Sequence, residues 1–122
     1  MNTDIPVNSI ASSEKSVVLT QLVSNVKLWV QQIREAYGDK ISVENLADEA
    51  DFLRYIMETD RYMAELVVEP AGFHPHRFVW FAALDKEKDP SQQYAYSYCD
   101  DGDSSLSDIF RNLNKGVELI TK

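Results

Sequence analysis

The spacing of apolar residues changes along the 122-residue chain and divides it into segments. Over residues 13–37, apolar residues recur at steps of three and four, as they do on the buried face of an amphipathic helix. They are Val18, Leu19, Leu22, Val23, Val26, Trp29, Val30 and Ile33. Gly38 follows, and glycine is favoured just past a helix end. The pattern predicts a helix over residues 13–37, preceded by a flexible arm over residues 1–12.

The segment after Gly38 has a second set of apolar residues at helical spacing. Ser42 suits the N-cap of a helix, and Glu44 suits its first turn, where negative charge is favoured. The apolar set is Val43, Leu46, Ala47, Ala50, Leu53, Ile56 and Met57. We therefore expect a second helix from Ser42, with acidic side chains on its solvent face.

From Arg61 onward the period shortens to that of β-strands. Residues 61–69 end at a Pro-Ala-Gly turn signal and are expected to form an edge strand. Residues 77–84 are apolar on both faces, which is typical of a central strand that is covered on both sides, or covered on one side while the other faces a partner. Residues 93–99 alternate strictly enough to predict a third strand.

A final apolar stripe predicts a C-terminal helix. It consists of Leu106, Ile109, Phe110, Leu113, Val117 and Ile120. The order of elements predicts one α+β domain over residues 13–122: two N-terminal helices, a small three-stranded antiparallel sheet and a C-terminal helix, packed in two layers.

Charge is uneven along the chain, whose net charge is -8. Residues 44–69 hold eight acids and only two bases, Arg54 and Arg61. Residues 100–122 hold five acids against three bases. Such a field repels phosphate backbones and anionic membranes, and it steers a basic protein toward the surface. The alternative is that the acidic surface serves solubility alone.

The acidic stretch from Asp100 to Phe110 does not match a calcium loop or a hydrolase motif. An EF-hand loop that begins at Asp101 would place Leu106 at the position of the required glycine. The segment around Ser104 is similar to the GDSL hydrolase block, but a second serine follows Ser104 and no Asp-x-x-His follows the block. A helix cap explains the stretch: Ser104 or Ser105 caps the helix and Asp108 lies in its first turn.

The remaining candidates for chemistry are His74, His76 and Cys99. Two histidines and one cysteine do not complete a zinc site. A single cysteine also excludes an intramolecular disulfide, which favours a reducing compartment. The chain begins without a signal-peptide pattern, so we expect a cytoplasmic protein. Because none of these candidates completes a motif, we also expect no catalytic residue, metal or cofactor.

Tyr94, Tyr96 and Tyr98 are predicted to lie on one face of the third strand, opposite small residues. If the small face meets the helices, the tyrosines form an exposed aromatic patch next to the acidic segments. If the tyrosines meet the helices, their rings belong to the core and their hydroxyls lie at its rim. The sequence leaves both orientations open.

The charge and the aromatic residues together predict a small acidic protein that docks on and neutralises or escorts a basic protein. The residues expected to bind the partner are Glu44, Asp48, Glu49, Asp51, Tyr94, Tyr96, Tyr98, Asp100, Asp101 and Asp103. In general character, the chain resembles the immunity proteins that neutralise bacterial toxins, many of them nucleases. A secretion chaperone or adaptor that dimerises through the first helix is one alternative. A ligand-binding protein or enzyme that uses His74, His76 and the tyrosines is another.

Overall fold

The computed structural model describes residues 18–71, 77–101 and 103–122. Its elements, in chain order, are helix α2 (Leu19–Tyr37), strands β1 (Ser42–Glu49), β2 (Phe52–Glu58), β3 (Tyr62–Val68), β4 (Val79–Asp85) and β5 (Tyr94–Cys99), and helix α3 (Leu106–Ile120). Short 3-10 turns lie at Gly38–Lys40 and Pro90–Gln92.

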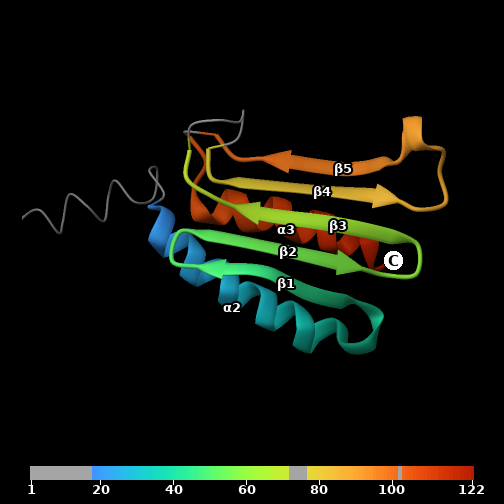
Figure 1. Cartoon of the computed structure of the whole chain (residues 1–122), viewed down its shortest axis with the longest axis horizontal. Coiled ribbons are helices and arrows are strands. Elements are labelled where there is room, and N and C mark those ends of the chain that lie inside the picture. The colour runs from blue at the N-terminus through green and yellow to red at the C-terminus, as the bar shows by residue number, and fades with distance from the viewer. Residues whose placement is uncertain (1–17, 72–76, 102) are drawn as a thin grey trace, which may run out of the picture.

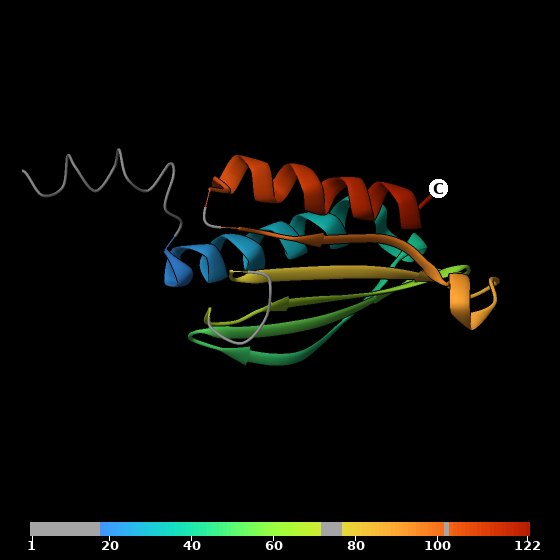
Figure 2. The ribbon, with the colours of Figure 1, turned by 90° about the horizontal axis from the view of Figure 1, so that it is seen from above.

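The strands form one five-stranded antiparallel sheet in the order β1-β2-β3-β4-β5 (Figure 1). Each strand therefore pairs with its neighbours in sequence, so short connections suffice. Both helices lie side by side on one face of this sheet (Figure 2). None of the described residues forms a helix on the opposite face.

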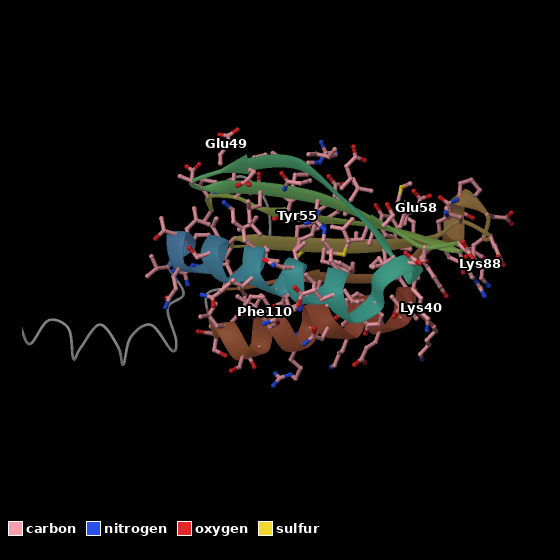
Figure 3. The ribbon with its side chains drawn as sticks, turned by 90° about the horizontal axis from the view of Figure 1, so that it is seen from below. Lys40, Glu49, Tyr55, Glu58, Lys88 and Phe110 are labelled. Atoms are coloured by element: carbon pink, nitrogen blue, oxygen red, sulfur yellow. The ribbon has the colours of Figure 1, made fainter. Side chains whose placement is uncertain are left out.

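The core fills the space between the sheet and the two helices. Alternate residues of the central strands point into it, including Leu53 and Met57 of β2, Leu66 of β3 and Phe81 of β4, all of which are fully buried. Figure 3 shows Tyr55 of β2 between the sheet and the helices. Each fully buried side chain of this size contributes about 1.5–3 kcal/mol relative to an exposed one.

The helices also contact each other across the core. Trp29 of α2 donates a hydrogen bond from Nε1 to Oδ1 of Asn114 of α3, at 2.8 Å. The Trp29 ring packs against the Phe110 ring with centroids 6.1 Å apart. This contact satisfies the indole N–H at the border of the core, where it would otherwise lose its hydrogen bond to water.

The predicted second helix is wrong, and so is the predicted three-stranded sheet. The segment after Ser42 forms β1 and β2, joined by a turn at Ala50 and Asp51. In β2, Leu53, Tyr55 and Met57 are buried while Arg54 is exposed, which is a period of two. The apolar residues of this segment fit a helical stripe as well as a strand, and pairing with β3 decides in favour of the strand.

Other predicted elements are present with adjusted bounds. The first helix is confirmed from Leu19, and Gly38 ends it with a φ of 53°, a left-handed value that favours glycine. The arm predicted over residues 1–12 and the predicted start of this helix at residues 13–17 lie outside the described residues. The strand predicted at residues 61–69 is β3, but it lies at the centre of the sheet and not at its edge. Ser105 caps α3 as predicted, and its hydroxyl accepts from the backbone N–H of Asp108 at 3.1 Å.

Candidate functional site

The side of the sheet opposite α2 and α3, here called the helix-free face, carries the side chains that alternate with the core residues. Three rows cross it. One row places Val67 of β3 opposite Trp80 of β4, and Trp80 opposite Cys99 of β5. Another places Met63 opposite Leu84, and Leu84 opposite Tyr94. Glu65, Ala82 and Ser97 form the row between them.

These rows make the β3–β5 side of the helix-free face mainly apolar. We call this region the apolar half; it consists of Met63, Val67, Trp80, Ala82, Leu84 and Tyr94. Val67 and Ala82 are buried by their neighbours, Trp80 and Leu84 are partly exposed, and Tyr94 is 69% exposed. A partly exposed Trp and a largely exposed Tyr, at opposite ends of the apolar half, suit the composition of protein interfaces, in which aromatic residues are enriched.

On the β1–β2 side of the same face, acids outnumber bases. Its one base among the strand residues is Arg54, which pairs with Glu65 of β3, and Ala47, Phe52 and Ile56 are its apolar residues. We call this side the acidic half, defined by Glu44 and Glu49 of β1 and Glu58 of β2. Glu44 and Glu49 are exposed and form no ion pair with any residue that the structure describes, whereas Lys86 Nζ lies 2.7 Å from Glu58 Oε2. Figure 3 shows Glu49 on the side of the sheet away from the helices. The acidic half thus has two carboxylates, those of Glu44 and Glu49, that no described residue neutralises.

Of the residues predicted to bind a partner, Glu44, Glu49 and Tyr94 lie on the helix-free face. Asp51 lies in the β1–β2 turn and is exposed. Asp48 lies on the other side of β1, where its Oδ1 is 2.6 Å from Nζ of Lys27 on α2. Its hydrogen bond to Lys27 raises the pKa of that ammonium.

Tyr96 and Tyr98 point toward the helices, which is the second of the two predicted orientations. Tyr96 donates from its hydroxyl to the backbone oxygen of Asn112 at 2.7 Å, and its ring meets Phe81 edge-on. Burial raises the pKa of both hydroxyls. The prediction that all three tyrosines share one face is wrong for Tyr94. The register of β5 shifts next to Leu84, so the Tyr94 side chain projects to the face of the sheet opposite Tyr96 and Tyr98.

Asp100 is a structural residue, because its carboxylate is only 2% exposed and is occupied by the backbone. Its Oδ1 accepts from the backbone N–H groups of Arg77, Phe78 and Val79 at 3.0, 2.8 and 2.8 Å. These three hydrogen bonds hold the start of β4 against the end of β5. Asp101 and Asp103 are exposed beyond the end of β5, and Asp101 accepts from the Asp103 backbone and the Ser104 hydroxyl.

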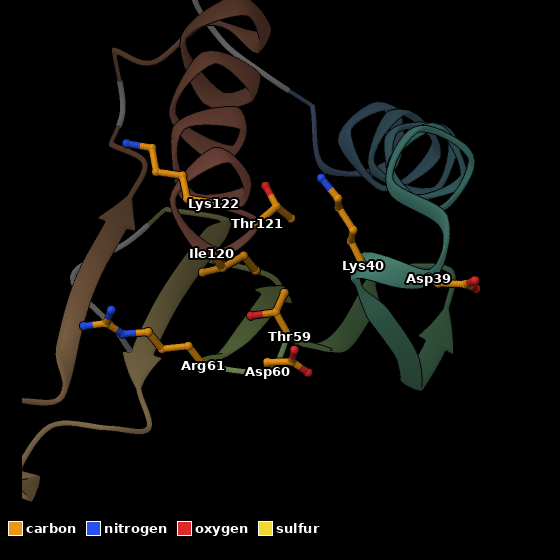
Figure 4. A pocket seen from close by; sticks show the side chains of 8 residues that line it. All are labelled: Asp39, Lys40, Thr59, Asp60, Arg61, Ile120, Thr121 and Lys122. Carbon is orange, nitrogen blue, oxygen red and sulfur yellow. The ribbon is translucent and has the colours of Figure 1, made fainter.

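A hollow of about 430 Å³ lies at the C-terminal end of α3 (Figure 4). Acidic and basic side chains alternate around it: Asp39, Lys40, Asp60, Arg61 and Lys122. Arg61 is already engaged with Asp85, at 2.9 Å. The hollow therefore presents no field of a single sign.

The described part of the chain has neither a metal-binding cluster nor a membrane-spanning helix. No group of three His, Cys, Asp or Glu residues there has the geometry to hold a metal ion. His74 and His76 lie outside the described residues. None of the described helices combines the length and the apolar character that a membrane crossing requires.

No protein-family model, curated protein or solved structure matches this chain.

Sequence reasoning did not single out Trp80, Leu84, Met63 or Ile56 as surface residues of one face. The sequence does contain a signal for this surface. Residues 77–84 are apolar on both faces, and one interpretation of such a strand is that one of its faces meets a partner. The missing information was the pairing of β1 with β2, which places Glu44 opposite Ile56 on that same face.

Proposed function

We propose that this chain is a protein-binding protein that docks its helix-free face onto a basic protein and thereby neutralises or escorts it. The observation that carries the proposal is the division of one uncovered sheet face into an apolar half and an acidic half. Apolar and aromatic residues supply the desolvated centre of an interface, and uncompensated acids at its side steer a cationic partner into place.

The position of the acids supports docking through this face. Glu44 and Glu49 lie on the same face as Trp80, so one partner can contact both halves at once. The net charge of -8 extends the attraction beyond the contact residues. An immunity-type inhibitor of a basic bacterial toxin, such as a nuclease, is a protein of this kind.

The stripe on α2 does not favour a chaperone that dimerises through its first helix. Leu22, Val26 and Val30 of that stripe are already buried in the core of their own domain. The side of α2 that remains exposed has a large apolar side chain at Leu28, and polar or charged residues such as Gln21 and Lys27 lie near it in sequence.

The test compares two charge reversals of equal size. Glu44→Lys with Glu49→Lys alters the acidic half, and Glu35→Lys with Glu118→Lys alters exposed positions on the helices. Proteins captured by the wild-type chain from its host are identified by mass spectrometry, purified, and their binding kinetics measured over a range of salt concentrations. We expect a basic protein whose association is slowed at low salt by the first pair more than by the second.

The apolar half is tested on the same purified partner with Trp80→Ala. Aromatic anchors at interface centres contribute about 2 kcal/mol or more, so dissociation should accelerate roughly 30-fold. Thermal unfolding of the free variant controls for folding, and Tyr94→Ala, at a more exposed site, gives a second variant. Equal kinetics for both charge-reversal pairs, together with unchanged dissociation for Trp80→Ala and Tyr94→Ala, would contradict the proposal.

A further inference from the structure

The two outer strands of the sheet differ in how they are protected against pairing with another chain. Free strand edges expose unpaired backbone groups, and proteins commonly block them with charges and bulges. β1 carries three acids, Glu44, Asp48 and Glu49, and has a register irregularity between Asn45 and Ala47. β5, with the sequence YAYSYC, carries no charged residue, and its register irregularity lies between Tyr94 and Tyr96, before Ser97 and Cys99.

The backbone of β5 presents donors and acceptors outward. The N–H of Asp100 donates to the oxygen of Val79 on β4, at 3.3 Å. Because the direction of these groups alternates along an antiparallel strand, the N–H and C=O groups of Cys99 and Ser97 point away from β4. Both residues are exposed. Figure 1 shows β5 at the margin of the sheet, with none of the labelled helices or strands beyond it.

The free edge is continuous with the apolar half of the helix-free face. Cys99 lies opposite Trp80, and Tyr94 lies opposite Leu84. A strand added beside β5 would place every second side chain next to Ser97 and Cys99 on this face. It would extend the apolar half by one strand.

We propose that β5 receives an extended segment of the basic partner as a sixth strand. This inference rests on the proposed function, because it specifies how the partner meets the helix-free face. The added segment has apolar residues at alternate positions and a basic residue at the end that passes Asp101 and Asp103, which are exposed just beyond β5. Strand addition obtains affinity from backbone hydrogen bonds and specificity from alternate side chains.

Charge favours a different chain over a second copy as the occupant. Two copies would each bring a net charge of -8 to the seam. A second copy would also bring its own exposed Asp101 and Asp103, and so add further negative charge. A basic segment instead brings positive charge to these acids.

The edge is tested with Ser97→Pro. This substitution removes one backbone N–H that points outward and keeps the backbone groups of β5 that bond to β4. Proline is tolerated in a strand where its nitrogen faces solvent. Cys99→Lys is a second variant, since an edge lysine opposes strand addition without the backbone constraint of proline. Ser97→Ala is the matched control, and thermal unfolding establishes that each variant folds.

The probe is a fluorescent peptide of two arginines followed by four valine-threonine pairs, measured by fluorescence anisotropy. We expect saturable binding to the wild-type chain and to Ser97→Ala, and at least a tenfold higher Kd for Ser97→Pro and Cys99→Lys. Amide hydrogen exchange should slow at Ser97 and Cys99 when the peptide binds. Absence of saturable binding, or equal Kd values for all four proteins, would overturn the inference.

Two further results separate this inference from the proposed function. If the intact basic partner is weakened by Trp80→Ala but not by Ser97→Pro, the helix-free face binds without strand addition and only the inference fails. If sedimentation shows a wild-type dimer that Cys99→Lys dissociates, the edge serves a second copy and the inference is likewise overturned.

Discussion

Gly116 is the residue at which α3 comes closest to the sheet. A Cβ atom placed there would lie 2.4 Å from Cε1 of the Phe81 ring, and Phe81 is fully buried. A contact this short forces the ring or the helix to move. The absence of a side chain at Gly116 therefore sets the distance between α3 and β4.

Gly116→Ala should lower the free energy of unfolding by about 1–3 kcal/mol, the usual cost of overpacking a core. Helix propensity acts in the opposite direction, since alanine is favoured over glycine by about 1 kcal/mol within a helix. Urea unfolding measures the sum. Glu118→Ala, at an exposed position of the same helix, is the control, and a Gly116→Ala variant more stable than wild type would contradict the close approach.

The start of α3 is set by a local signal in the sequence, a capping box at its N-terminus. Ser105 and Asp108 form a capping box in which each side chain accepts from the backbone N–H of the other. Arg111 also pairs with Asp108, at 2.5 Å. These hydrogen bonds hold the pKa of Asp108 below its usual value, and the Ser105 backbone is the largest cause.

Ser105→Ala should destabilise the protein by about 1 kcal/mol at neutral pH, because one N–H at the helix start loses its acceptor. Chemical denaturation measures the loss. Ser107→Ala, two residues later and exposed, removes a hydroxyl without affecting the cap. Equal stability of the two variants would show that the capping box contributes nothing measurable.

At the scale of the whole molecule, acid sensitivity depends on a carboxylate buried at the end of the sheet. Asp85 is 4% exposed and forms hydrogen bonds with Nε and Nη2 of Arg61. The Arg61 guanidinium holds the pKa of Asp85 below its usual value. A carboxyl whose pKa is lowered by folding stabilises the folded state above its unfolded pKa, and this contribution is lost as the pH falls through its folded pKa.

Arg61→Gln should therefore be less stable than wild type at pH 7, and the difference should shrink as the pH falls below about 4, the ordinary range of a free Asp. Denaturation at a series of pH values measures this. Arg54→Gln is the control, because the carboxylate that it pairs with, Glu65, is more exposed and surface pairs contribute little. A difference that grows on acidification would contradict the assignment.

Several elements could be predicted because their signals are local. The stripes of α2 and α3, the alternation in β3 and the cap at Ser105 all depend on residues a few positions apart. The helix-free face could not be predicted in the same way. It depends on the pairing of Glu44 with Ile56 and of Trp80 with Cys99, which brings together residues distant along the chain.

Composition and short-range periodicity suffice for the α+β class, the end of α2 at Gly38, the start of α3 at Ser105 and the acidic charge. Only the tertiary structure decided that residues 42–58 form a hairpin, because a short apolar run fits a helix or a strand until a neighbouring strand pairs with it. It also decided the orientation of the tyrosines. The register shift in β5 sends Tyr94 to the helix-free face while Tyr96 reaches Asn112, and such a shift arises only where two strands pair.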